Sequence, residues 1–195
     1  MRKLFFSFLF LFILSACSQG ENIDTTEDEV LSIQNVEIPN VIFTSEKQNN
    51  KIDEEEIKLS IKTYLDSYEE LSNASEPFQE IIYEDKEFNK INKLTKENDK
   101  NFSNYILNNT LPEGYQEESE RISHYITALN ETLSEVNEML DEVNKEGLPK
   151  ENNIRSIIDK RDVVNGREQK KIEEFLDKKN IDTKAFGREH KEKEK

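Results

Sequence analysis

Between residues 53 and 180, apolar side chains recur at the spacing of amphipathic helices. The first run repeats at alternating intervals of four and three residues, at Ile57, Ile61, Tyr64, Tyr68 and Leu71. Asp53, with Glu56 three residues later, has the pattern of a capping box, in which two side chains satisfy the free N–H groups of a helix start. The sequence therefore predicts a helix from Asp53 to about Asn73.

Two longer runs follow, and each predicts a helix of about 30 residues, roughly 45 Å long. The second helix begins near Pro77, because proline is favoured in a first turn, and Leu111-Pro112-Glu113-Gly114 ends it. Its core-facing positions are Phe78, Ile81, Ile82, Phe88, Ile91, Leu94, Thr95, Asn98, Phe102, Tyr105, Ile106 and Asn109. The third helix has a strict four-three stripe, made of Ile122, Ile126, Leu129, Leu133, Val136, Leu140 and Val143. Lys145, Gly147 and Pro149 are its stop signal.

A fourth, weaker run holds Ile154, Ile157, Ile158, Val164, Ile172, Phe175 and Leu176. Asn165-Gly166 breaks or kinks this helix, because glycine costs about 1 kcal/mol relative to alanine inside a helix. Beyond Ile181 the chain becomes polar, and we predict residues 181–195 to be a disordered charged tail. Short connections between long helices favour antiparallel neighbours. The predicted fold is all-α: an antiparallel bundle of three long amphipathic helices plus a weaker fourth, over residues 51–180.

The N-terminus has a different pattern, in which two basic residues, an apolar stretch and the single cysteine follow one another. Arg2 and Lys3 precede an apolar run over residues 4–14, whose length suits a signal peptide, at about 7–15 residues, better than a membrane span of about 20. Leu14-Ser15-Ala16-Cys17 resembles the lipobox of bacterial lipoproteins, which are cleaved before the cysteine and diacylated on its thiol. We therefore predict a signal peptide over residues 1–16, with Cys17 as the lipidated residue. The alternatives are an uncleaved short anchor and a secreted protein with a free thiol.

Residues 17–50 are predicted to form a lipidated N-terminus and a spacer. Residues 18–29 are acidic and too poor in apolar side chains to fold, and as a random coil the whole spacer would extend about 30 Å. Residues 30–43 are more apolar and are interrupted by Pro39. They are an extended arm that docks on the helical body, a segment that contains a short strand, or a spacer with some apolar residues.

Charge narrows the classes of partner. The formal net charge of −15 at pH 7 argues against nucleic acid, whose phosphates attract basic proteins. It also argues against a body that lies on an anionic leaflet. With Cys17 acylated, the mature chain can form no internal disulfide. Two acyl chains suffice for stable membrane residence, so we predict a membrane-tethered protein outside the cytoplasm.

The segment Asn98-Asp99-Lys100-Asn101-Phe102 resembles the motif of the NDxxF lipoproteins of low-GC Gram-positive bacteria. The nearby Leu111-Pro112-Glu113-Gly114-Tyr115 and Arg121-Ile122-Ser123-His124-Tyr125-Ile126 also fit that family. The resemblance covers the lipobox and roughly residues 54–143, and it implies no established reaction. It implies a location on the outer face of the cytoplasmic membrane of a Gram-positive bacterium, where the lipid anchor would hold the protein. A weaker similarity is to helical lipoproteins assigned to cell-wall binding.

The motif also has a physical interpretation. Asn98 lies one helical turn before Phe102, so its amide is expected to face the third helix, near Tyr125, Ile126 or Leu129. A buried amide without partners costs about 1–3 kcal/mol, whereas with partners it fixes the register of two helices. We expect Asp99 beside this interface and Phe102 within it. The alternative is that these side chains contact a ligand.

Patterns for catalysis and metal binding are weak. His124 follows Glu120 by one turn, with Glu117 near the same face, and such a set can hold a metal. Di-metal bundles, however, repeat Glu-x-x-His on two helices, so we interpret this set as a solvated face and predict no metal site, catalytic residue or cofactor. The predicted function is a non-enzymatic surface lipoprotein that contacts an envelope protein or the cell wall. The alternatives are a wall-active or accessory enzyme and a metal- or solute-binding lipoprotein.

Overall fold

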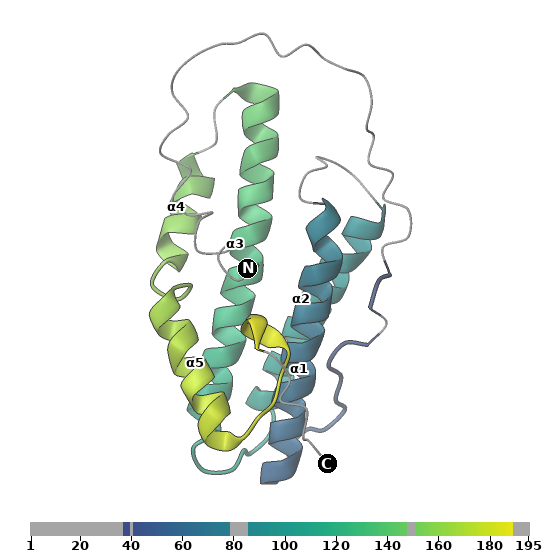
Figure 1. The fold of residues 1–195 in the computed structure, drawn as a ribbon, viewed down its shortest axis with the longest axis vertical. Helices are drawn as coiled ribbons and strands as arrows, with labels where there is room; N and C mark the ends of the chain where they lie inside the picture. The colour runs from purple at the N-terminus through teal and green to yellow at the C-terminus, as the bar shows by residue number, and fades with distance from the viewer. Residues whose placement is uncertain (1–36, 40, 79–85, 148–150, 189–195) are drawn as a thin grey trace. The chain divides into compact units, whose positions relative to one another are not determined.

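The computed structural model describes residues 37–39, 41–78, 86–147 and 151–188, all within the unit of residues 33–195. Its helices are α1 (Glu54–Ser75), α2 (Lys86–Leu107), α3 (Gln116–Glu146), α4 (Glu151–Lys160) and α5 (Gly166–Lys179), with short 3₁₀ turns η2 (Glu76–Phe78) and η3 (Ala185–Gly187) (Figure 1). The predicted all-α class is confirmed. None of these helices is long and apolar enough to cross a membrane, within the ranges described. The predicted signal peptide, Cys17, residues 18–36 and the tail beyond 188 lie outside those ranges.

Helix α1 begins where the sequence predicts. The Asp53 carboxylate accepts a hydrogen bond of 2.9 Å from the N–H of Glu56, which satisfies one of the free donors of a helix start. Three acidic residues in the first turn, Glu54 to Glu56, also interact favourably with the positive end of the helix dipole. The predicted stripe then faces the core.

Helix α2 runs antiparallel to both α1 and α3, as predicted. Near the end of α2, Tyr105 donates to Glu56 near the start of α1. Earlier in α2, Asp99 accepts from Tyr64, further along α1. The order is also reversed between α2 and α3. Gln116 at the start of α3 donates to Ile106 near the end of α2, and Asn130 further along α3 donates to Asp99 earlier in α2.

The predicted fourth helix consists of two helices, so Asn165-Gly166 breaks it. Asn165 has an extended backbone, and its side-chain oxygen accepts from the N–H groups of Arg167 and Glu168. This cap starts α5. Helix α4 packs beside the second half of α3, where Ser156 bonds Glu135, and α5 packs beside the first half.

The prediction of disorder beyond Ile181 is wrong for residues 181–188, which we call the C-terminal clasp. Ile181, Thr183 and Ala185 are buried. Asp66 in α1 accepts from the Thr183 hydroxyl at 2.7 Å and from the Lys184 N–H at 2.8 Å. A short buried segment without helical periodicity leaves no pattern in the sequence, so the packed body reaches residue 188 rather than 180.

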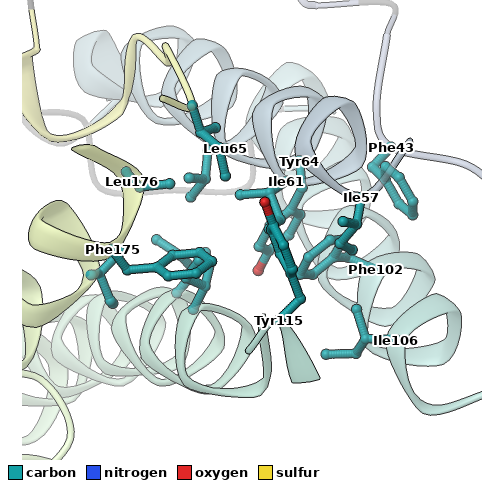
Figure 2. Close-up of a cluster of buried hydrophobic side chains, with 14 of the residues drawn as sticks. Phe43, Ile57, Ile61, Tyr64, Leu65, Phe102, Ile106, Tyr115, Phe175 and Leu176 are labelled. Atoms are coloured by element: carbon teal, nitrogen blue, oxygen red, sulfur yellow. The ribbon is translucent and has the colours of Figure 1, made fainter. Parts of the chain in front are cut away.

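A chain segment before α1 also packs on the body. Figure 2 shows Phe43 within the core beside side chains from α1 and α2. The main buried cluster includes Phe43, Ile57, Ile61, Tyr64, Leu65, Phe102, Ile106, Tyr115, Phe175 and Leu176. Ile38 and Ile42 pack against a second cluster around Leu71 and Ile91. Of the interpretations of residues 30–43, the docked arm is correct for the residues described. We call residues 41–52 the arm.

The second half of α3 departs from the prediction. Its stripe is packed into the core as far as Leu129, but Leu133, Leu140 and Val143 are 45%, 51% and 36% exposed. Helix α4 contacts this half through polar groups, since Lys160 lies 2.7 Å from Glu135. Beyond Leu129, Val136 is partly buried, and the other three positions of the stripe are left about one-third to one-half exposed.

Candidate functional site

The motif Asn98-Asp99-Lys100-Asn101-Phe102 lies in α2 and links it to α1, α3 and the arm. Asn98 and Asp99 are 1% and 8% exposed, and Phe102 is fully buried. Lys100, by contrast, is exposed. Successive residues on a helix point about 100° apart, so the motif reaches several neighbours at once.

The amide of Asn98 holds the arm and α1. Its oxygen accepts from the Phe43 N–H at 2.8 Å, and its nitrogen donates to the Tyr64 carbonyl at 3.2 Å. The expected neighbours Tyr125 and Ile126 in α3 are not the partners of this amide. That expectation assumed that α3 is the only partner of the buried side of α2, whereas the arm and α1 share that side.

Asp99 makes the connection to α3. Its Oδ1 accepts from the Tyr64 hydroxyl at 2.8 Å, and its Oδ2 accepts from Asn130 at 2.9 Å. Burial raises the pKa of Asp99 to about 6, with a smaller contribution from Glu131, while the bonds from Asn130 and Tyr64 oppose the rise. Burial and the nearby Asp99 also raise the pKa of Tyr64 well above its ordinary value. The carboxyl group therefore ties three helices and titrates near neutral pH.

Phe102 is buried, as predicted, and two rings pack on it. The Tyr64 ring stacks on it with centroids 4.2 Å apart and planes within 5°. The Phe43 ring meets it edge-on at 5.3 Å and 85°. Offset-stacked and edge-to-face pairs are the favourable geometries for aromatic rings. Figure 2 shows these three rings side by side.

Two further asparagines hold the arm, which the sequence did not predict: its patterns identify Asn101 only as part of the motif, and Asn109 only as a core-facing position. Asn101 donates to the Phe43 carbonyl at 3.0 Å. Asn109 donates to the Lys47 carbonyl at 2.9 Å and accepts from the Asn50 N–H at 3.0 Å. Asn98 and Asn101 lie three residues apart and share one side of α2, and Asn109 lies two residues beyond the end of that helix. This spacing was the available signal for a polar binding face.

Of the residues weighed as metal ligands, Glu117 and Glu120 have other partners, and His124 is exposed. Arg121 lies 3.1 Å from Glu117 and also pairs with Glu118. Glu120 accepts from Gln116 at 2.6 Å. In the described part of the chain, no group of three or more His, Cys, Asp or Glu side chains could hold a metal ion.

Taken together, the motif side chains act as a structural junction. One carboxyl group and two amides bond groups of α1, α3 and the arm, and the Phe102 ring anchors two others. The buried polar atoms of Asn98 and Asp99 are directed at protein groups rather than at an open site. The class that fold and junction define is a helical body with an extended N-terminal arm docked on its second helix.

Comparisons add no relative to this description. No family profile, curated protein or solved structure matches the chain. The resemblance to NDxxF lipoproteins therefore stays a prediction.

Proposed function

We propose that this protein is a lipid-anchored surface lipoprotein whose helical body is a non-enzymatic interaction module of the Gram-positive envelope. The sequence Leu14-Ser15-Ala16-Cys17 supports the anchor, and the acidic residues that follow support a spacer that keeps the body off the lipid. The partner is an envelope protein or a component of the wall.

The partly exposed apolar stripe of α3 is the main observation that supports the interaction role. Leu133, Leu140 and Val143 follow one another at intervals of seven and three, so they share one side of the helix. The adjacent α4 adds Ile154 and Ile158, which are also exposed. An exposed apolar side of a helix on a highly charged protein supports an interaction site. A helical face with this spacing suits a partner helix or an apolar groove.

The anchor is tested by mass spectrometry of the N-terminus from the native host. We expect the mature chain to begin at a diacylated Cys17 and to fractionate with membranes, and the Cys17→Ala variant to leave the membrane fraction. An intact or unacylated N-terminus on the wild-type chain would contradict the anchor.

The interaction role is tested by copurification from detergent-solubilised membranes. We compare wild type with Leu140→Glu, which places a charge in the stripe, and with Leu59→Glu, a matched change at an exposed leucine of α1. A partner retained by wild type and Leu59→Glu but lost from Leu140→Glu supports the proposal. Equal recovery with both variants, or release of muropeptides by the purified protein, contradicts it.

A further inference from the structure

We propose that the side of α2 that holds the arm is a binding site for extended peptides that carry an aromatic side chain, and that the arm occupies this site as an internal ligand. The arm site consists of Asn98, Asn101, Phe102, Tyr105 and Asn109. It is a second recognition site, and it depends neither on the α3 stripe nor on the lipid anchor.

The asparagines of the arm site recognise main chain rather than side chains. Asn98 and Asn101 bond the N–H and the carbonyl of the same residue, Phe43. Asn109 bonds main-chain atoms further along the arm. Capture of both main-chain groups of an extended residue is how sheet edges bind peptides, and it tolerates many sequences. Here helix side chains supply the bonds that a strand would supply.

A single side-chain pocket gives the site its preference. The Phe43 side chain is 4% exposed, and its ring packs edge-on against Phe102 and Tyr105, each at 5.3 Å. By contrast, residues 44–51 are all exposed. Over residues 43–51 the arm contributes its main chain, one buried ring and the exposed Lys47, whose ammonium lies 2.6 Å from Glu56. The buried contacts therefore select an extended segment with an aromatic residue.

The geometry also allows the arm to leave without unfolding the helices. Nothing in the described chain covers residues 44–51 from outside, because they face solvent. Helix α1 has its own cap at Asp53, so its start does not depend on the arm. Segments with few buried side chains open locally at lower free energy than the core. A peptide that competes with residues 43–51 therefore displaces one ring, the Lys47–Glu56 ion pair and a short set of main-chain bonds, whereas the flanking Ile42 and Ile52 are packed separately.

The test uses the full chain and a fluorescent peptide of the arm sequence, residues 38–48, together with the same peptide carrying Phe43→Ser. The Phe43→Ala protein has lost the internal ring, and we expect it to bind the phenylalanine peptide at least tenfold more tightly than wild type does. The serine peptide should not bind. Adding Asn101→Ala to the Phe43→Ala protein should weaken binding at least fivefold. Leu140→Glu should leave peptide binding unchanged, which separates this site from the stripe.

Equal binding of the two peptides, or no binding to a Phe43→Ala protein that melts cooperatively, overturns the proposal. Hydrogen exchange on the wild type provides a second measurement that needs no variant. The N–H groups of Phe43, Asn50 and Ile52, which are hydrogen-bonded in the docked arm, should exchange at least tenfold faster than buried amides of α1. If they exchange only with global unfolding, the arm does not open and the proposal fails.

Discussion

The hydroxyl group of Tyr64 in α1 donates a 2.8 Å hydrogen bond to Asp99 in α2, and the rest of the motif is arranged around this pair. The Tyr64 ring stacks on Phe102, while the second oxygen of Asp99 accepts from Asn130 in α3. A single carboxyl group thus determines how three helices meet. Because it is buried and its pKa lies near 6, the junction responds to pH.

We predict that Asp99→Asn stabilises the protein at pH 7.5. The folded-state pKa of Asp99 is raised from 3.8 to about 6, so between these values the native state holds more protons than the unfolded state. Stability is then highest at low pH and falls as pH rises through about 6. The difference corresponds to at most about 3 kcal/mol. The side-chain oxygen of an asparagine at position 99 still accepts from the Tyr64 hydroxyl. If the Asn130 amide rotates, its oxygen accepts from the new side-chain nitrogen, which restores the bond between positions 99 and 130. Urea unfolding of both proteins at pH 4.5 and 7.5 measures the effect.

Asp66→Asn is the matched control, because its effect has the opposite sign. Burial raises the pKa of Asp66, but hydrogen bonds from Lys62, the Lys184 N–H and Thr183 lower it below its ordinary value overall. This carboxylate therefore stabilises the protein at neutral pH, and its contribution disappears as pH falls through the lowered pKa. If Asp99→Asn were instead less stable than wild type at pH 7.5, the assigned titration of Asp99 would be wrong.

We predict that Asn98→Leu destabilises the protein by about 1–3 kcal/mol, because it leaves the N–H of the docked Phe43 without its acceptor. The sequence alone favoured the opposite result, since an asparagine that only fixes register can be replaced by leucine with a gain in stability. Thermal melting compares the variant with Lys100→Ala, an exposed change in the same motif that should stay within about 0.5 kcal/mol. A higher melting temperature for Asn98→Leu would refute its role in holding the arm.

We predict that a chain ending at Arg188 melts like the full chain, whereas a chain ending at Asn180 is less stable by about 3 kcal/mol. Loss of the C-terminal clasp exposes apolar surface at Ile181 and Ala185, and burial of an isoleucine is worth about 1.5–3 kcal/mol. It also removes two hydrogen bonds to Asp66, at about 0.5–1.5 kcal/mol each. Calorimetry of the two truncations measures this, and equal melting would show that the clasp contributes nothing.

We predict that Gly147→Ala lowers stability by about 1 kcal/mol, through the backbone alone. Gly147 caps α3 with φ of 79°, and an added Cβ would meet no atom within 4 Å. The cost is therefore the left-handed conformation rather than a clash. Gly147→Asn, which tolerates this conformation better, should lose less. Equal melting of all three proteins would contradict the assigned cap.

Periodicity predicted where the helices lie but not all their bounds: residues 76–78 form a 3₁₀ turn, and α2 begins at Lys86 rather than near Pro77. It did not predict the segments between the helices. The four-three spacing of Ile57, Ile61 and Tyr64 marks a helix because helical geometry repeats along the sequence. The arm and the C-terminal clasp are each held by single buried residues, such as Phe43 and Ile181, and by hydrogen bonds to residues far away in sequence. Such contacts leave no local pattern. The α3 stripe shows the converse limit, since spacing predicts an apolar face but not what covers it.

The clasp has a consequence for the order in which the chain matures. The bond from Thr183 to Asp66 spans 117 positions, so α1 acquires its last neighbours only when nearly the whole polypeptide has emerged. Contacts between such distant parts form late, because the intervening chain must first be brought together. A nascent chain that still lacks residues 181–188 has an incomplete core, so its fold is less stable during synthesis. For a chain that is exported, as we propose above, late closure favours passage through the translocation channel, which admits unfolded chains.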